Sequence, residues 1–247
     1  MSPLILSLIS AVGIALLSII GIITLAFKEK VVNKILLWFV SFSAGALLGG
    51  AFFHLLPEAI EKYGEPINIF KYTLVGLCLF FVLERVLRWH HCHKHGCEVH
   101  SRHLGQMNLI GDAFHNLIDG IIIFSAFSVS TVLGGTVLLS IALHEIPQEI
   151  GDFGVLLYAG YKKSKALLLN LISATTVIMG VLLGYFLINH IENLNNFLLP
   201  LAAGGFIYIA TSDLIPELHR EKETKKSLIA FVIFVIALLF MLLIAEH

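Results

Sequence analysis

Long apolar runs dominate this chain and decide what it can fold into. A helix needs about 20 apolar residues to cross a bilayer, and runs of that length recur along the 247 residues, of which 57% are hydrophobic and only 13% are charged. Backbone polar groups in lipid must be satisfied within their own segment, so such runs form helices and not open sheets. The sequence therefore predicts an all-α integral membrane protein, with residues 1–247 forming a single transmembrane domain. Its eight expected spans lie at residues 4–27, 35–57, 67–88, 105–128, 132–160, 165–189, 196–217 and 227–245.

Basic residues predict how these spans are oriented. All but two of the 16 lysines and arginines fall in the connections after the first, third, fifth and seventh spans, and only Lys62 and Lys71 fall on the other side. Cytoplasmic connections carry such an excess. We therefore expect a multi-pass protein of the plasma membrane with these four connections in the cytoplasm and both termini outside. The formal net charge of -1 provides no basic field for binding nucleic acid.

An internal repeat relates the second and seventh spans. The stretches AGALLGGAFFHLLPEAI (44–60) and AGGFIYIATSDLIPELH (203–219) align at a constant offset of 159 residues, which places Pro57 opposite Pro216. The two spans run in opposite directions in the expected topology. This pattern indicates an inverted repeat of spans one to three and six to eight around a central pair, spans four and five, as in many secondary transporters. The alternative is that small-residue packing seams recur by chance in membrane helices.

Polar side chains interrupt the two central spans. On the fourth span, Asp112, His115, Asn116 and Asp119 fall within one arc of about 100° on a helix. His115 and Asp119 are one turn apart, so both side chains can reach the same ion. The fifth span repeats this device with pairs of polar residues that are also one turn apart. Its polar residues are His144, Glu145, Gln148, Glu149 and Asp152.

The chemistry of these two polar faces points to a divalent metal. Imidazole and carboxylate together suit zinc and other first-row dications. A bound dication also offsets the cost of charged side chains at bilayer depth, which is on the order of 3 kcal/mol each on insertion scales. The alternative interpretation is a set of interhelical hydrogen bonds that hold the bundle together. The number of polar groups on two faces favours the metal.

The same residues carry a resemblance to a known family. HNLIDG in the fourth span and HEIPQEIGDF in the fifth resemble the H-N-x-x-D-G and H-E-x-P-x-E signatures of the ZIP (Zrt/Irt-like) metal transporters. FFHLLPEA in the second span and GGFIYIATSDLIPE in the seventh extend the likeness over the whole chain. The resemblance implies a homodimer that moves zinc, or alternatively iron, manganese or cadmium, toward the cytoplasm. It implies that spans one, four, five and six move as a group, and it implies no organic cofactor.

The resemblance also implies a two-metal centre on the fourth and fifth spans. The residues that it assigns to the first metal are His115, Asp119, His144 and Gln148. The residues that it places near the second metal are Asn116, Asp119 and Glu145, with Gln148 bridging and Glu149 as an additional acid. Many members have histidine where this chain has Gln148. Because an amide is a weaker ligand than imidazole, the metal preference of this chain is expected to differ from theirs.

A histidine- and cysteine-rich loop at about 89–103 follows the third span. In the expected topology this loop is cytoplasmic, which indicates transient metal capture after translocation. It contains no C-x-x-C pair, so a closed structural zinc site is not expected. The alternative is a disordered polar loop with incidental histidines. The candidate ligands are His90, His91, Cys92, His93, His95, Cys97, His100 and His103.

A third set of residues contains candidates for metal access to the site or release from it. Four of them lie near the ends of the second and seventh spans, and two lie on the central spans. The alternative for the span-end acids is an ordinary position in the headgroup zone. The six candidates are His54, Glu58, Asp112, Asp152, Asp213 and Glu217.

Two other functions compete with uptake. An intramembrane zinc metalloprotease needs H-E-x-x-H, but here Gln148 replaces the second histidine and Pro147 breaks the turn between them. A metal efflux carrier also uses such pairs, but carriers of that kind resemble six-span bundles. No G-x-x-x-x-G-K-[ST] motif is present, so ATP is not expected to drive transport. The sequence therefore predicts a transporter and not an enzyme.

Overall fold

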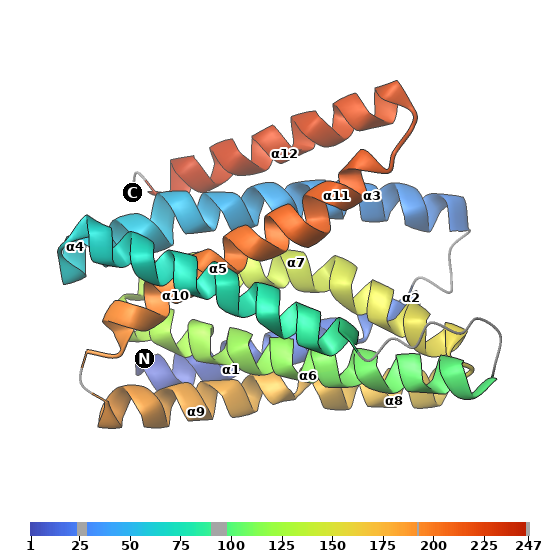
Figure 1. Cartoon of the computed structure of the whole chain (residues 1–247), viewed down its shortest axis with the longest axis horizontal. Coiled ribbons are helices and arrows are strands. Elements are labelled where there is room, and N and C mark those ends of the chain that lie inside the picture. The colour runs from blue at the N-terminus through green and yellow to red at the C-terminus, as the bar shows by residue number, and fades with distance from the viewer. Residues whose placement is uncertain (24–28, 90–97, 192, 246–247) are drawn as a thin grey trace.

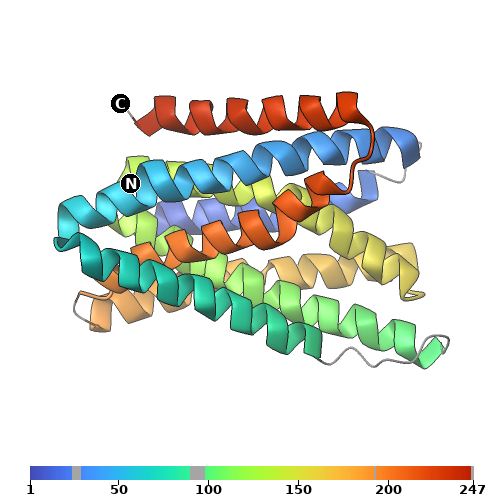
Figure 2. The ribbon, with the colours of Figure 1, turned by 45° about the horizontal axis from the view of Figure 1, so that its top comes forward.

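The computed structural model describes residues 1–23, 29–89, 98–191 and 193–245, which form a bundle of helices without strands (Figures 1 and 2). The first half contains α1 (Pro3–Leu17), α2 (Ile20–Ile23), α3 (Glu29–Gly49), the π-helix η2 (Gly50–Leu55), α4 (Leu56–Tyr63), α5 (Pro66–Trp89) and α6 (Glu98–Val129). The second half contains α7 (Thr131–Tyr158), α8 (Lys163–Ala174), α9 (Thr176–His190), α10 (Asn195–Ile209), the π-helix η3 (Ala210–Leu214), α11 (Ile215–His219) and α12 (Thr224–Ala245).

Most of these helices are long and apolar enough to span a membrane. In the described ranges, 6 helical stretches meet that condition of length and hydropathy. Of the other expected spans, α1 has only 15 residues, and α7 carries the polar residues of the fifth span. The all-helical membrane class is confirmed, whereas the count of eight spans stays a prediction. The six stretches are Ile35–Tyr63, Pro66–Arg85, Asn108–Val129, Lys163–His190, Asn195–His219 and Thr224–Ala245.

The bundle has two distinct ends. Both termini, α4 and the connection from α9 to α10 lie at one end, here called the terminal end (Figure 1). The ends of α2, α5, α7 and α11 and the starts of α3, α6, α8 and α12 lie at the other, here called the opposite end (Figure 1). These helix ends flank the four basic connections of the sequence. Lys62 and Lys71 belong to α4 and α5 near the terminal end.

Close helix contacts occur at glycines that the repeat alignment pairs. α3 packs along α12, and α5 packs along α10. A Cβ atom on Gly45 would lie 2.4 Å from the Phe234 carbonyl oxygen of α12. On Gly204, 159 residues later, a Cβ atom would lie 2.0 Å from the Thr73 carbonyl oxygen of α5. Both positions therefore require glycine, because any side chain would push the paired helices apart.

The two π-helical segments also occupy equivalent places. η2 runs directly into α4, whose first turn contains Pro57, and η3 runs directly into α11, whose first turn contains Pro216. Proline lacks an N–H group and clashes with the preceding turn. The backbone widens into a π-turn ahead of each proline and thereby accommodates it.

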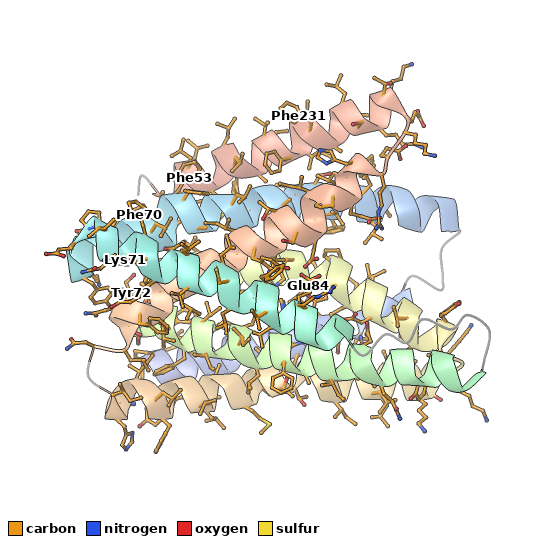
Figure 3. All side chains as sticks on the ribbon, viewed as in Figure 1. Phe53, Phe70, Lys71, Tyr72, Glu84 and Phe231 are labelled. Carbon is orange, nitrogen blue, oxygen red and sulfur yellow. The ribbon has the colours of Figure 1, made fainter. Side chains whose placement is uncertain are left out.

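The outer surface of the bundle is apolar where lipid is expected. α12 and α5 lie on the outside (Figures 1 and 2), and only 17% of the most apolar window of each is buried. Phe231 of α12 and Phe70 of α5 project from the bundle (Figure 3) and are exposed. The interior lies between α1, α6, α7, α9 and α10, and this is where most of the polar residues of the central spans are buried.

Candidate metal centre

Two histidines and two acids from the central helices converge on one point. α6 supplies His115 and Asp119, and α7 supplies His144 and Glu145. The two helices are adjacent because a short turn joins them, in which the Ser130 hydroxyl accepts from the Leu133 N–H at 3.1 Å and caps α7. One ligand atom from each of the four residues lies within 4.8 Å of all the others. We call this group the four-donor cluster.

The spacing of the four-donor cluster fits a tetrahedral ion. The two histidine Nε2 atoms are 3.1 Å apart, and His144 Nε2 lies 3.2 Å from Asp119 Oδ2. His115 Nε2 lies 3.6 Å from Glu145 Oε1. Donors bound tetrahedrally to zinc, each about 2.0–2.1 Å from the ion, are about 3.3 Å from one another. The cluster therefore has the dimensions of a zinc site.

The acids of this cluster have no other hydrogen-bond partner. Both carboxylate oxygens of Asp119 and both of Glu145 are buried without one. A buried carboxylate left in this state is costly unless a proton or a cation balances it. Burial without partners therefore indicates that these oxygens serve a positive ion.

The backbone around His144 holds its ring in place. His144 Nδ1 donates to the Ser140 carbonyl oxygen at 3.1 Å, which leaves the Nε2 lone pair for a metal. Pro147 removes the helical donor of the Leu143 carbonyl. That carbonyl instead accepts from the Ser43 hydroxyl of α3 at 2.5 Å. Helix α3 thus fixes the backbone directly before His144.

The other predicted ligands form a separate group nearer the opposite end. Asp112 Oδ1 accepts from the side-chain amides of Asn116 at 2.9 Å and Gln148 at 3.2 Å. Asp152 Oδ1 accepts from Asn108 Nδ2 at 3.0 Å. Buried Glu149 accepts in the same way from the Asn170 amide of α8. We call Asp112, Glu149 and Asp152 the amide-paired acids.

The structure therefore divides the residues predicted from the sequence into two groups. His115, Asp119, His144 and Glu145 come together, whereas Asn116, Gln148 and Glu149 contact the amide-paired acids or belong to them. Sequence reasoning missed two partners of these acids, Asn108 and Asn170. Asn170 had a signal of its own, because it is the single amide in the apolar first half of the sixth expected span.

A cavity of about 760 Å³ leads from the four-donor cluster toward the opposite end. His115 and His144 lie at its inner limit, and the ends of α5 and α10 form its wall. On the other side of the cluster, the apolar side chains Ile122, Ile141 and Phe206 are buried. The candidates for metal access or release that line this cavity are Asp112, Asp152, Asp213 and Glu217.

Two access candidates lie away from the cavity. His54, in η2, is buried, and its Nε2 lies 2.9 Å from the Met241 carbonyl oxygen of α12. Glu58 pairs with Lys62 at 3.2 Å near the terminal end. Residues 90–97 of the histidine- and cysteine-rich loop lie outside the described residues. His100 and His103 belong to the first turns of α6, and their side chains are not described.

The fold and the site together define a class: a helical membrane protein with an interior cluster of two histidines and two acids that could hold a metal and that a cavity connects to one end. A family model described as "ZIP Zinc transporter" matches residues 2–104 and 90–245 of this sequence. The chain belongs to the ZIP zinc transporter family, as the two signatures in the central spans predict.

Named relatives agree with this assignment. Zinc transporter zipt-7.1 of Caenorhabditis briggsae is 29% identical over 245 residues, covering 75% of this chain and 62% of the relative. Zinc transporter ZIP13 of Pongo abelii is 31% identical over 205 residues, covering 76% and 60%. Zinc transporter YKE4 of Saccharomyces cerevisiae is 28% identical over 244 residues, covering 84% and 70%. The chain thus spans about three fifths of the length of the first two.

These relatives also decide between the alternatives for chemical class. Each of the three is named as a transporter and none as a hydrolase. The expectation that the chain is not an enzyme is therefore confirmed, and the metalloprotease alternative has no support. The metal is cargo in such a protein and not a resident cofactor.

Proposed function

We propose that this chain carries divalent metal ions, zinc first, across the membrane toward the cytoplasm. The observation that carries the proposal is the four-donor cluster, whose zinc-like spacing and partnerless buried carboxylates lie at the inner limit of a cavity. The relatives' names as zinc transporters support the same cargo. Iron, manganese and cadmium are alternative cargo for the same donors.

The proposal includes a second metal position beside the cluster. Asn116 and Gln148 lie on the same helix faces, and the Asn116 side-chain oxygen is buried without a hydrogen-bond partner. A rotation of the Gln148 amide away from Asp112 would offer its oxygen to an ion shared with Glu145. Glu149 is the additional acid of this region.

The route of release is proposed to follow the acids that line the cavity. Asp112 and Asp152 lie on the central helices, and Asp213 and Glu217 lie on the facing wall. Carboxylates on both walls lower the energy of a dication that leaves the cluster. Residues 90–103 are proposed to capture the metal after its release. Glu58 and His54 remain candidates for the access side.

The orientation in the membrane completes the proposal. The cavity opens toward the end that carries nearly all basic residues, which is the cytoplasmic end by the charge rule, and this places both termini outside. Eight spans with an inverted repeat are supported by the paired glycines and the paired π-helices. A homodimer in the plasma membrane is part of the same proposal, and α1 and α7 supply the two further spans.

The test is zinc flux in proteoliposomes that enclose a zinc-sensitive dye. The parent protein should admit zinc down its gradient, whereas the His115→Ala, His144→Ala double variant should reduce the rate at least about tenfold, because loss of even supporting groups costs metal sites 10–100-fold. Equal elution on size exclusion controls for folding. Equal flux in both proteins would overturn the proposal.

A further inference from the structure

Helices α6 and α10 are held together at the terminal end and stand apart at the opposite end. In the half toward the opposite end, the cavity separates Asp112 and His115 of α6 from Tyr208 of α10. At the terminal end, the last turns of α6 lie beside the first turn of α10 (Figure 1), and polar side chains join them. The interface between the two helices is therefore open in one half and closed in the other.

One asparagine of α10 bridges to two serines of α6 in the closed half. The Ser125 hydroxyl donates to Asn195 Oδ1 at 2.9 Å, and Asn195 Nδ2 donates to the Ser128 hydroxyl at 2.9 Å. Ser128 in turn donates to the Ser125 carbonyl oxygen at 2.7 Å. An amide suits this position because it donates and accepts at the same time.

A lysine makes a second contact across the same end. Lys62 Nζ of α4 donates to the Val129 carbonyl oxygen at 3.2 Å and also pairs with Glu58. Val129 is the last residue of α6, where carbonyl groups have no helical donor and the helix dipole favours a cation. We call Lys62, Ser125, Ser128, Val129 and Asn195 the terminal clasp.

We propose that the terminal clasp is a latch that holds the terminal end of the metal pathway shut while the cavity is open. This inference rests on the proposed transport and orientation, because a metal from outside must reach the buried cluster from the terminal end. For that, the apolar core to which the buried side chains Ile122 and Phe206 belong must open. They lie on α6 and α10, the two helices that the clasp joins, so the clasp must release first.

The strength of the clasp suits a latch. Its contacts with Asn195 are neutral hydrogen bonds, which contribute modestly because water replaces them when they break. Loss of the two bonds between Asn195 and the serines should shift the balance between closed and open forms about tenfold. An apolar contact of the same area between α6 and α10 would be harder to separate than the clasp. A single hydrogen bond would stabilise the closed form too little.

The experiment measures access from outside with a buried thiol. In a background with Cys78, Cys92 and Cys97 replaced by serine, Ile122→Cys places a thiol three residues beyond Asp119 on α6. Intact cells are treated with a membrane-impermeant thiol reagent. Adding Asn195→Ala should raise the labelling rate about tenfold. Ser128→Ala, a milder change, should raise it less, and the double variant should not exceed Asn195→Ala because both changes break the same contact.

Asn196 provides the matched control. It is the neighbouring asparagine, it lies outside the clasp, and its buried side-chain oxygen has no hydrogen-bond partner. Asn196→Ala should leave the labelling rate unchanged. An unchanged rate in Asn195→Ala, or an equal rise in both variants, would overturn the latch. Zinc flux of the same parent in proteoliposomes is measured in parallel. Absence of that flux would refute the proposed transport itself, whereas flux without a labelling change refutes only the latch.

Discussion

Two groups of buried acids lie on α6 and α7, within two helical turns of each other, and their surroundings differ. Each amide-paired acid accepts a hydrogen bond from an asparagine or glutamine side chain. The acids of the four-donor cluster, Asp119 and Glu145, have no hydrogen-bond partner and face two imidazole nitrogens. Amide donors satisfy part of a carboxylate within the protein, whereas partnerless oxygens beside imidazoles need an ion. We therefore propose that the surroundings of an acid, and not its position in the stripe, distinguish a metal ligand.

The largest expected effect comes from the same isosteric change in both groups. Asp119→Asn removes a partnerless carboxylate from the cluster and should lower zinc uptake at least about tenfold. Asp112→Asn removes a charge that amides already stabilise, so uptake should fall only about two- to threefold. Uptake into proteoliposomes at equal protein content measures both, and the thermal melting of each variant controls for folding. Equal losses in the two variants would show that amide pairing does not separate the groups.

Much of this comparison could be predicted from the sequence. Helical periodicity gave each central span a polar face, with His115 and Asp119 on the fourth span and His144 and Glu145 on the fifth, and these four side chains do meet. The paired prolines of the second and seventh spans predicted an internal likeness, and both mark π-helical turns. The spacing of side chains along a helix and the effect of a proline on its backbone are properties of a single segment. Both can therefore be predicted from the sequence of that segment.

The division into the four-donor cluster and the amide-paired acids could not be predicted from the sequence. Whether Gln148 offers its oxygen to a metal or its NH₂ group to Asp112 depends on the rotation of one side chain. Glu149 and its partner Asn170 come from helices whose contact only the tertiary packing decides. The cavity also depends on helices far apart in the chain. These features arise from the packing of one segment against another. The periodicity within a single segment carries no information about that packing.

An intermediate effect is expected where the two groups meet, at Gln148. In Gln148→His, an imidazole replaces the amide one turn from His144, and imidazole favours zinc more strongly than a neutral oxygen does. The ratio of zinc to manganese uptake should therefore rise severalfold, and competition between the two metals in proteoliposomes measures it. Asn108→His, which changes another amide of the acid group, is the matched control and should leave the ratio unchanged. An unchanged ratio in Gln148→His would confine the metal to the four-donor cluster.

The smallest effect is expected at Ser43, which supports the cluster from outside both groups. Its hydroxyl lies 2.5 Å from the Leu143 carbonyl oxygen of α7 and 2.7 Å from the Phe39 carbonyl oxygen of its own helix. Ser41, two residues earlier and also buried, bonds only within α3, to the Leu37 carbonyl oxygen at 2.7 Å. Ser43→Ala should therefore destabilise the protein by about 1 kcal/mol more than Ser41→Ala, because only Ser43 satisfies a carbonyl on a neighbouring helix.

That difference corresponds to a melting temperature about 2–4 °C lower for Ser43→Ala than for Ser41→Ala in a chain of this length. The same variant should weaken zinc binding slightly, because the Leu143 carbonyl directly precedes His144 and its loss of a donor loosens the helix backbone ahead of Pro147. Glu149 and Asp152 lie beyond Pro147 on α7 and should be unaffected. Equal melting temperatures for the two serine variants would mean that α3 does not hold the cluster, and that the rigidity of the four-donor site comes from α6 and α7 alone.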